Sequence, residues 1–268
     1  MACWKMWKIL KPEVRRGFDR SAWRAWLTAA MVWLFSSAMT RGIEPAERSF
    51  QEGIQSYLAG NYTNAAELFR GAAAQSQGAG AWHNVGNAEW RSGRVGAAVL
   101  AWERARWIDP FHEPARANLD FARKTSSLEH PELAWYEICS TWLPTSWWGW
   151  LAVVCFWGSA TLLILPGALR WGRSDWHQGL ASAGFAVFLL VLPALAGVWT
   201  RSRLGVVLSS PTPLRLAPAE HAQFIGKLNP GEAVRREGRR GGYYYVHAGN
   251  DIAGWVKPGE VGWIAEMP

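Results

Sequence analysis

Two long stretches without charge limit what this chain can fold into. Residues 147–169 and residues 177–199 contain no Asp, Glu, Lys or Arg, and each is long enough for a membrane-crossing helix, which takes about 20 residues. Backbone N–H and C=O groups in lipid must find partners within the protein, so a spanning segment is a helix unless it belongs to a closed barrel. Only a short loop joins the two stretches. We therefore predict a transmembrane helical hairpin over residues 147–200.

The placement of tryptophan supports the same interpretation. The chain has 20 Trp residues, and Trp147, Trp150, Trp176 and Trp199 stand at the ends of the two stretches. An indole ring is favoured at the depth of the lipid headgroups, where its body is in an apolar environment and its N–H is hydrated. The lipid bilayer is thus the first expected partner of this chain.

A basic leader precedes a shorter apolar segment at the N-terminus. Residues 1–41 carry eight Lys and Arg residues and two acidic residues, and the apolar residues 25–39 have the length of a signal-peptide core. The small residues Ser36 and Ala38 suit cleavage after Ala38, and an uncleaved signal anchor is the alternative. In either case residues 1–40 direct the export of the downstream chain. Because much of the net charge of +7 lies in this leader, we expect no nucleic-acid partner.

Charge also predicts the sidedness of the hairpin. Basic residues close to spans tend to stay in the cytoplasm, which places the leader there together with the hairpin loop that carries Arg170 and Arg173. Arg201 and Arg203, after the second stretch, favour the opposite orientation. Because the leader carries the larger excess of charge, we predict a multi-pass protein of the bacterial inner membrane whose other domains lie in the periplasm.

One pattern occurs twice upstream of the hairpin, with an offset of 33 positions. The matched residues are Gly53 and Gly86, Tyr57 and Trp90, Gly60 and Gly93, Tyr62 and Val95, Ala65 and Ala98, and Phe69 and Trp102. This pattern resembles the tetratricopeptide repeat, a helix–turn–helix unit of about 34 residues. A further helix near residues 114–125 is expected to cap the stack. We therefore expect a domain of about two and a half repeats over residues 44–126.

A binding groove is the functional consequence of such repeats. Proteins of this class bind peptides or protein segments along the concave face that the first helices form. The alignment directs four side chains toward this face: Asn84, Asn87, Arg91 and Asn118. Side-chain amides and a guanidinium group can hydrogen-bond an extended backbone. The alternative is that these four are ordinary solvated helix residues.

A β-rich segment comes after the hairpin, over residues 204–266. Short runs of β-branched and aromatic residues alternate there with Pro, Gly and Asn, which predicts about five short antiparallel strands in a small barrel. An Arg-bearing first strand, a Pro-Gly-Glu turn, the strand YYYV and the sequence Gly-Trp-Val resemble bacterial SH3 domains. That family usually has Gly before Pro where this chain has Ala217–Pro218. Residues 127–146 are expected to be a linker.

Four aromatic residues are the candidate ligand contacts of this SH3-like barrel. Alternation along the strand puts Tyr243 and Tyr245 on one face and Tyr244 on the other. One of the two faces must be in the core, and we expect Trp255 beside it. Tyr243, Tyr244, Tyr245 and Trp255 are candidates for binding a Pro-rich strand or a glycan. Packing at the rim of the barrel is the alternative.

No catalytic or metal-binding motif accompanies these modules. The six His residues are scattered, without the H-E-x-x-H spacing of a zinc site, and the sequence has no Walker A, G-x-G-x-x-G or G-x-S-x-G motif. Cys3, Cys139 and Cys155 lack the C-x-x-C spacing of a metal site or redox pair. We therefore expect no enzymatic activity, no metal and no cofactor.

The order of the modules resembles one family. A signal segment, tetratricopeptide repeats, a helical hairpin and a terminal SH3-like barrel make a multidomain α plus β membrane protein similar to the BatE proteins of the bacterial Bat (aerotolerance) operon. The resemblance implies a non-catalytic scaffold that works with von Willebrand factor A-domain membrane proteins and a MoxR-type ATPase. Two alternatives remain open. One is a protein that binds the cell wall (peptidoglycan) or senses the state of the envelope, and the other is the opposite topology, with the modules in the cytoplasm.

Overall fold

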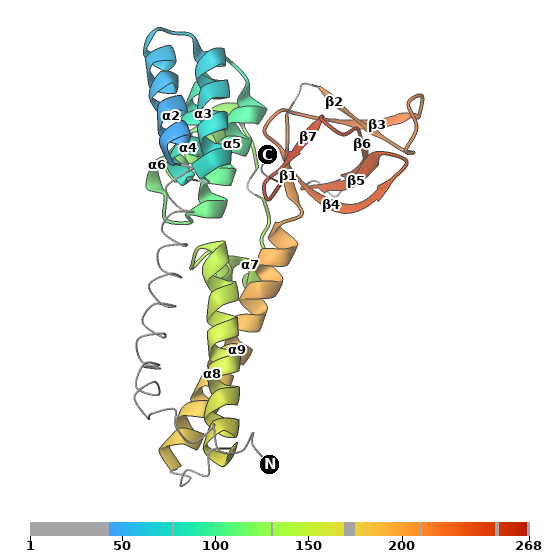
Figure 1. Cartoon of the computed structure of the whole chain (residues 1–268). Coiled ribbons are helices and arrows are strands. Elements are labelled where there is room, and N and C mark those ends of the chain that lie inside the picture. The colour runs from blue at the N-terminus through green and yellow to red at the C-terminus, as the bar shows by residue number, and fades with distance from the viewer. Residues whose placement is uncertain are drawn as a thin grey trace, which may run out of the picture. The chain divides into compact units, whose positions relative to one another are not determined.

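The structure is a computed structural model that describes residues 43–76, 78–129, 131–168, 175–208, 211–249 and 252–266. It is an α plus β protein with a helical region, two long apolar helices and a curled antiparallel sheet (Figure 1). The described residues from Ala46 onward belong to one compact unit. The expected signal segment, residues 1–40, lies outside the described residues, as do Arg170 and Arg173 of the hairpin loop.

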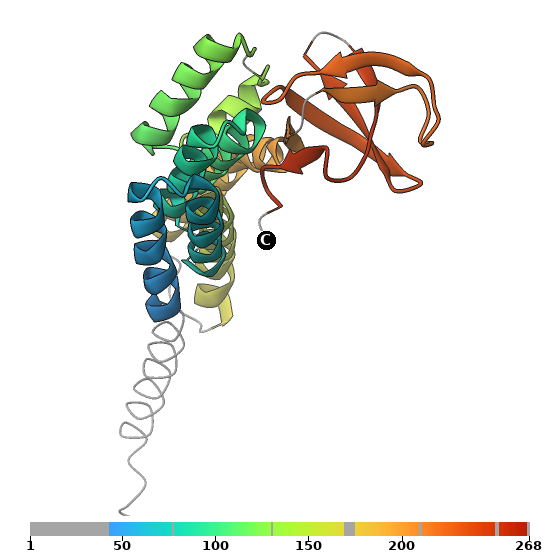
Figure 2. The same ribbon diagram turned by 90° about the horizontal axis from the view of Figure 1, so that it is seen from above.

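The helical region consists of short antiparallel helices. These are α2 (Ile43–Leu58), α3 (Tyr62–Ser76), α4 (Ala79–Arg91), α5 (Val95–Ile108) and α6 (Glu113–Ser126). From α3 onward, each helix packs against the next one along the chain (Figures 1 and 2). The helices α2 to α5 cover the two copies of the sequence pattern, and α6 lies where the capping helix was expected.

The first helix of each pair ends in the same way. Gly60 and Gly93 have φ angles of 81° and 80°. An L side chain is strained in this left-handed conformation, whereas Gly adopts it freely. Gly is therefore needed at the turn from α2 to α3 and at the turn from α4 to α5, which explains why it recurs at this position of the repeat.

The two helices of a pair cross where a Gly faces an aromatic ring. A Cβ atom added to Gly53 of α2 would lie 2.7 Å from the Phe69 ring on α3, and Gly86 of α4 has no room for a Cβ beside Trp102 of α5. The side chains of Phe69 and Trp102 are both 2% exposed, and full burial of such a side chain stabilises by roughly 1.5–3 kcal/mol. The repeated Gly and aromatic residues thus form equivalent contacts in both pairs.

Two helices have the length and apolarity to cross a membrane, α8 (Thr145–Ala168) and α9 (Asp175–Arg201). Their apolar segments have mean hydropathies of 1.8 and 2.2, and only 17% and 22% of these segments is buried inside the protein. A core helix of a soluble protein would bury most of its apolar surface. Apolar surface that stays exposed is favourable in lipid and costly in water. The two helices therefore support membrane association.

The segment before α8, which was expected to be a linker, contains the short helix α7 (Trp135–Cys139). This helix packs on the last turns of α9, where a Cβ on Gly197 would overlap the carbonyl oxygen of Tyr136. Glu137 is 1% exposed, while Trp135 on the same helix is 66% exposed. Within the segment that was expected to be a linker, Trp135–Cys139 is therefore folded against α9.

The strands form one seven-stranded sheet with the order β3-β2-β6-β5-β4-β1-β7, in which every neighbouring pair is antiparallel. The strands are β1 (Leu204–Val207), β2 (Thr212–Arg215), β3 (Phe224–Leu228), β4 (Ala233–Arg240), β5 (Tyr243–Ala248), β6 (Ile252–Val256) and β7 (Val261–Trp263). About five strands were expected, and the structure has two more. The sheet curls around a core of its own (Figure 1). Among the strands that the structure describes, β3 and β7 are at the edges, so this part of the chain forms a half-barrel.

The sheet packs directly on the helical region. Residues of β1 belong to the same buried cluster as those of α4 and α5. The backbones of α5 and β1 approach each other at Gly96, where a Cβ would overlap the carbonyl oxygen of Val207, and Gly262 of β7 lies equally close to Leu100 of α5. Because Gly96 has no side chain, the backbone of α5 contacts the backbone of β1. Because Gly262 has none, the backbone of β7 contacts the side chain of Leu100.

Replacing Gly96 with Ala should destabilise the protein. The new Cβ meets backbone atoms of β1, which cannot rotate away, so we expect the free energy of unfolding to fall by about 1–3 kcal/mol, as for other overpacked sites. The measurement is chemical unfolding of the full chain in mild detergent, followed by circular dichroism.

The matched control is Gly71→Ala on α3, because outside the nearby backbone of α3 itself no heavy atom lies within 4 Å of the position of its added Cβ. This variant should be as stable as the wild type, or more stable by up to about 1 kcal/mol through helix propensity. Equal stability of the two variants would show that α5 and β1 are not in contact.

Candidate functional site

A polar cluster joins α4 to α6 on the surface of the helical region. The amide nitrogen Nδ2 of Asn118 donates to Oδ1 of Asn87 at 2.7 Å and lies 3.2 Å from Nε2 of His83. The indole N–H of Trp102 donates to the same Oδ1 of Asn87 at 3.2 Å. Two of the four predicted groove residues, Asn87 and Asn118, are therefore brought together by folding.

The other two predicted groove residues differ in their surroundings. Asn84 follows His83 directly in α4, so it adjoins the cluster. Arg91 is exposed, and its guanidinium group lies 5.7 Å from the centre of the Tyr62 ring. Arg91 therefore lies further along α4, beside the first pair of helices.

His83 and His112 were not singled out from the sequence, yet both belong to this surface. Their rings lie 5.2 Å apart. Burial lowers the pKa of His83, the nearby His112 lowers it further, and the hydrogen bond with Asn84 acts in the opposite direction. The ring is therefore neutral at neutral pH. The signal in the sequence was the spacing of His83 and Asn87, which are four residues apart and so share a helix face.

The chemistry of this cluster is that of uncharged hydrogen bonding. It presents amide donors and acceptors and a neutral imidazole, all partly buried. Such groups match the N–H and C=O groups of an extended peptide backbone better than they match a charged ligand. Within the described residues no group of three or more His, Cys, Asp or Glu side chains is arranged to hold a metal ion.

The aromatic residues of the sheet lie on its two faces, as alternation predicted. Tyr245 faces Trp255 across the strand pair β5–β6, with ring centres 5.1 Å apart. Tyr243 lies on the same face, 5.9 Å from the Arg215 guanidinium group. Tyr244 points the other way and contacts Trp263, with ring centres 5.0 Å apart.

Trp255 was expected beside the core, and this expectation was wrong. The core face carries the fully buried Val246 and Val256, with Trp263 as its large aromatic residue. Trp255 is adjacent in sequence to Val256 and therefore points to the opposite face. The structure thus groups Tyr243, Tyr245 and Trp255 on one face and separates Tyr244 from them.

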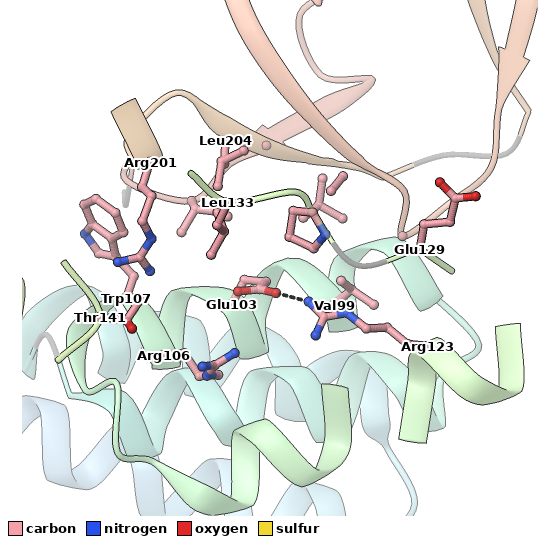
Figure 3. Close-up of a pocket in the computed structure, with 16 residues that line it drawn as sticks. Val99, Glu103, Arg106, Trp107, Arg123, Glu129, Leu133, Thr141, Arg201 and Leu204 are labelled. Carbon is pink, nitrogen blue, oxygen red and sulfur yellow. Dashed lines mark hydrogen bonds and ion pairs between the residues drawn. The ribbon is translucent and has the colours of Figure 1, made fainter. Parts of the chain in front are cut away.

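A cavity of about 130 Å³ lies where α5, the end of α9 and β1 meet (Figure 3). Glu103 pairs with Arg123 on one side of it. On the other side Nη1 of Arg201 donates to Oγ of Ser140 at 3.0 Å. The Nε atom of Arg106 is buried and has no hydrogen-bond partner among the described residues. Nothing in the sequence predicted this cavity, because its walls come from segments far apart in the chain.

One ion pair ties α7 to the sheet. Arg235 of β4 donates to Glu137 through Nη1 at 2.6 Å and through Nη2 at 3.1 Å, and the Ala134 N–H donates to the same carboxylate at 2.9 Å. Burial alone would raise the pKa of Glu137, but the hydrogen bonds from Arg235 and Ala134 outweigh it and the pKa is lowered. The carboxylate is therefore held in its charged form.

No protein-family model matches the chain, and none of the curated proteins matches it. The candidate sites consequently rest on the geometry described above.

Replacing Glu137 with Gln should destabilise the protein by about 2–3 kcal/mol at neutral pH, because the charged Arg235 then has no carboxylate partner. The loss of stability is smaller than for a fully buried pair because Arg235 is partly exposed to solvent. The pKa of Glu137 is lower in the folded state than the ordinary value of 4.5. Its contribution is therefore complete above that value and disappears as the pH falls through the folded-state pKa. Denaturant unfolding at pH 7 and at lower pH measures both effects.

Glu220→Gln is the matched control, because it removes a carboxylate from an exposed pair with Lys257. This variant should unfold like the wild type. A Glu137→Gln protein that is as stable as this control at neutral pH would contradict the ion pair between α7 and β4.

Proposed function

We propose that this chain is a non-catalytic membrane adaptor that holds partner proteins. The observation that carries the proposal is the polar cluster of His83, Asn87 and Asn118, which lies on a stack of repeated helix pairs within the same compact unit as two helices of membrane length. The cluster offers hydrogen bonds without charge. It therefore suits an extended segment of a partner chain that is recognised through its backbone.

The helical region is proposed to be a tetratricopeptide-repeat domain. The two left-handed Gly turns and the two crossings of Gly with an aromatic ring recur with the period of the sequence, which supports this assignment. Ala65 and Ala98 occupy equivalent positions and are both fully buried. Such repeats bury their apolar faces by stacking, and here α5 also stacks on the sheet.

The half-barrel is proposed to be an SH3-like domain. The turn at Pro230–Gly231, where Gly231 has a φ of 93°, and the Arg-bearing strand β2 support the assignment. Arg215 forms a two-pronged ion pair with Glu260, at 2.9 and 3.1 Å, so this Arg has a structural partner. This chain departs from the family pattern at Ala217–Pro218, where the family usually has Gly before Pro.

The order of these parts supports membership in the BatE-like group, and the partners proposed on that basis are von Willebrand factor A-domain membrane proteins and a MoxR-type ATPase. The proposed location is the bacterial inner membrane, with the helical region and the half-barrel in the periplasm. The larger charge excess of the leader supports this orientation.

A second candidate function is binding of the cell wall. The ring pair of Tyr245 and Trp255, together with Tyr243 on the same face, supports it, because aromatic faces pack on the apolar faces of sugar rings. Sedimentation of the detergent-solubilised full chain with purified peptidoglycan distinguishes the two functions. Binding that is lost in Trp255→Ala would favour this candidate over the adaptor.

Asn118→Ala should weaken capture of partners by the full-length, tagged chain from membranes in mild detergent. The hydrogen bond that Asn118 is proposed to make with the partner's backbone is worth about 1 kcal/mol. Its loss should therefore lower recovery of A-domain membrane proteins about fivefold. Arg116→Ala is the control, because Arg116 is exposed on the same helix outside the cluster. Failure of the wild-type chain to recover any A-domain protein, or equal recovery by both variants, would contradict the adaptor proposal.

The proposed orientation predicts that alkaline phosphatase is active when fused after residue 125 or at the C-terminus, because the enzyme matures only in the periplasm. A fusion within the hairpin loop, after Arg173, should be inactive. Active fusions in the loop together with inactive fusions at the other two sites would establish the opposite topology.

A further inference from the structure

We propose that a groove beside the last turn of α9 binds the phosphate of an anionic lipid headgroup. The groove has a volume of about 440 Å³, and its lining includes Arg203, Arg236, Arg239 and Tyr244. The inference rests on the proposed function in one respect, since it requires that α9 cross the bilayer.

The groove begins where the apolar helix ends. Arg203 lies two positions after the last residue of α9, and its N–H donates to the carbonyl of Thr200 at 3.2 Å, which continues the helical turn. Its guanidinium group lies 3.9 Å from the ring of Trp199, which is 60% exposed. A Trp at the end of a spanning helix lies at headgroup depth. Arg203 therefore lies at the depth of the lipid phosphates.

The sheet supplies the other side of the groove. The backbone N–H of Arg236 in β4 donates to the carbonyl of Arg203 at 2.9 Å, which fixes β4 against the end of α9. The Arg236 guanidinium group lies 4.7 Å from the Trp263 ring and 5.6 Å from the Tyr244 ring. The Arg239 guanidinium group lies 5.5 Å from the Tyr244 ring. These ring contacts hold the cations over the groove.

Charge in the groove favours an anion. Arg236 pairs with Glu266 at 2.6 Å. Among the described residues no ion pair is formed by Arg203 or Arg239. Glu237 also lines the groove, so its net charge is modest. Two guanidinium groups nevertheless remain available, and their planar N–H donors fit phosphate oxygens in pairs.

A lipid fits this site better than a free phosphate ion. Net charge this small attracts a dilute ion weakly, because Glu237 and Glu266 oppose it. An anionic leaflet supplies phosphate at high local concentration directly beside Trp199, and each Arg near such a surface contributes about a fivefold gain in binding. Because the groove lies at the end of α9, we expect it to bind a lipid headgroup phosphate in preference to a free phosphate ion.

Native mass spectrometry of the detergent-solubilised full chain tests the proposal, with short-chain phosphatidylglycerol and phosphatidylcholine as probes. The wild type should bind phosphatidylglycerol more tightly than phosphatidylcholine. In a chain with both Arg203→Gln and Arg239→Gln, binding of phosphatidylglycerol should weaken about 25-fold, because each lost guanidinium–phosphate hydrogen bond is worth about 1 kcal/mol, or about fivefold in affinity. Arg116→Gln should leave this binding unchanged, because Arg116 is exposed on α6 and is not part of the groove lining.

Three results would overturn the inference. Equal binding of the two lipids by the wild type would show that the groove does not select negative charge. An unchanged preference in the double variant would place the lipid elsewhere. Competition by inorganic phosphate at the concentrations at which phosphatidylglycerol binds would assign the site to a free ion.

A matching variant with Arg203→Lys and Arg239→Lys should retain most of the preference for phosphatidylglycerol. This variant distinguishes loss of charge from loss of the folded structure.

Retention in membranes after an alkaline carbonate wash separates this inference from the proposed function. A wild-type chain that washes out of the membrane contradicts the membrane anchor itself. A chain that is retained but shows no preference for phosphatidylglycerol contradicts only the lipid site.

Discussion

The contact between α5 and β1 determines how the described parts of this protein are joined. It exists because Gly96 has no side chain, so that the helix backbone reaches the carbonyl of Val207. The buried cluster of the helical region then continues into β1 without interruption. Helical repeats and small β-domains are often joined by open linkers. Here they share apolar core, and the free energy of that burial opposes their separation.

Arginine residues reinforce the same junction with polar contacts. Nη2 of Arg104 on α5 donates to the backbone carbonyls of Trp263 and Glu266, at 3.1 and 2.6 Å. Burial lowers the pKa of Arg104 to about 10, and the nearby Arg70 contributes to the same lowering. The side chain stays charged at neutral pH, and a charged donor makes strong hydrogen bonds to carbonyl oxygens. Arg235 has a similar role toward α7, through Glu137.

The features that the sequence predicted are those set by local spacing. A repeated Gly at the turn and a repeated Gly opposite an aromatic ring specify each helix pair through contacts within one repeat, so the period was visible before the fold was known. The apolar helices were equally visible, because length and absence of charge are properties of one segment. Alternation likewise assigned Tyr244 and Tyr245 to opposite faces.

The features that were missed depend on partners distant in the chain. Helix α7 has only five residues, too few for a helical pattern, and it is held by Gly197 and Arg235. His83 gains its role from Asn118, which α6 brings to it. The prediction that Trp255 lies beside the core was also wrong, because the way the sheet curls determines which face of a strand is in the core.

The direct passage from α9 into β1 has a mechanical consequence. Only two residues separate Arg201 from Leu204. Helix α7 packs on the last turns of α9, and the backbone N–H of Arg236 in β4 donates to the Arg203 carbonyl. A helix whose apolar length differs from the local bilayer thickness responds by tilting. If α9 crosses the bilayer as proposed, a tilt of α9 that follows a change in bilayer thickness would reorient the half-barrel and the helical region together, because no flexible linker separates α9 from β1.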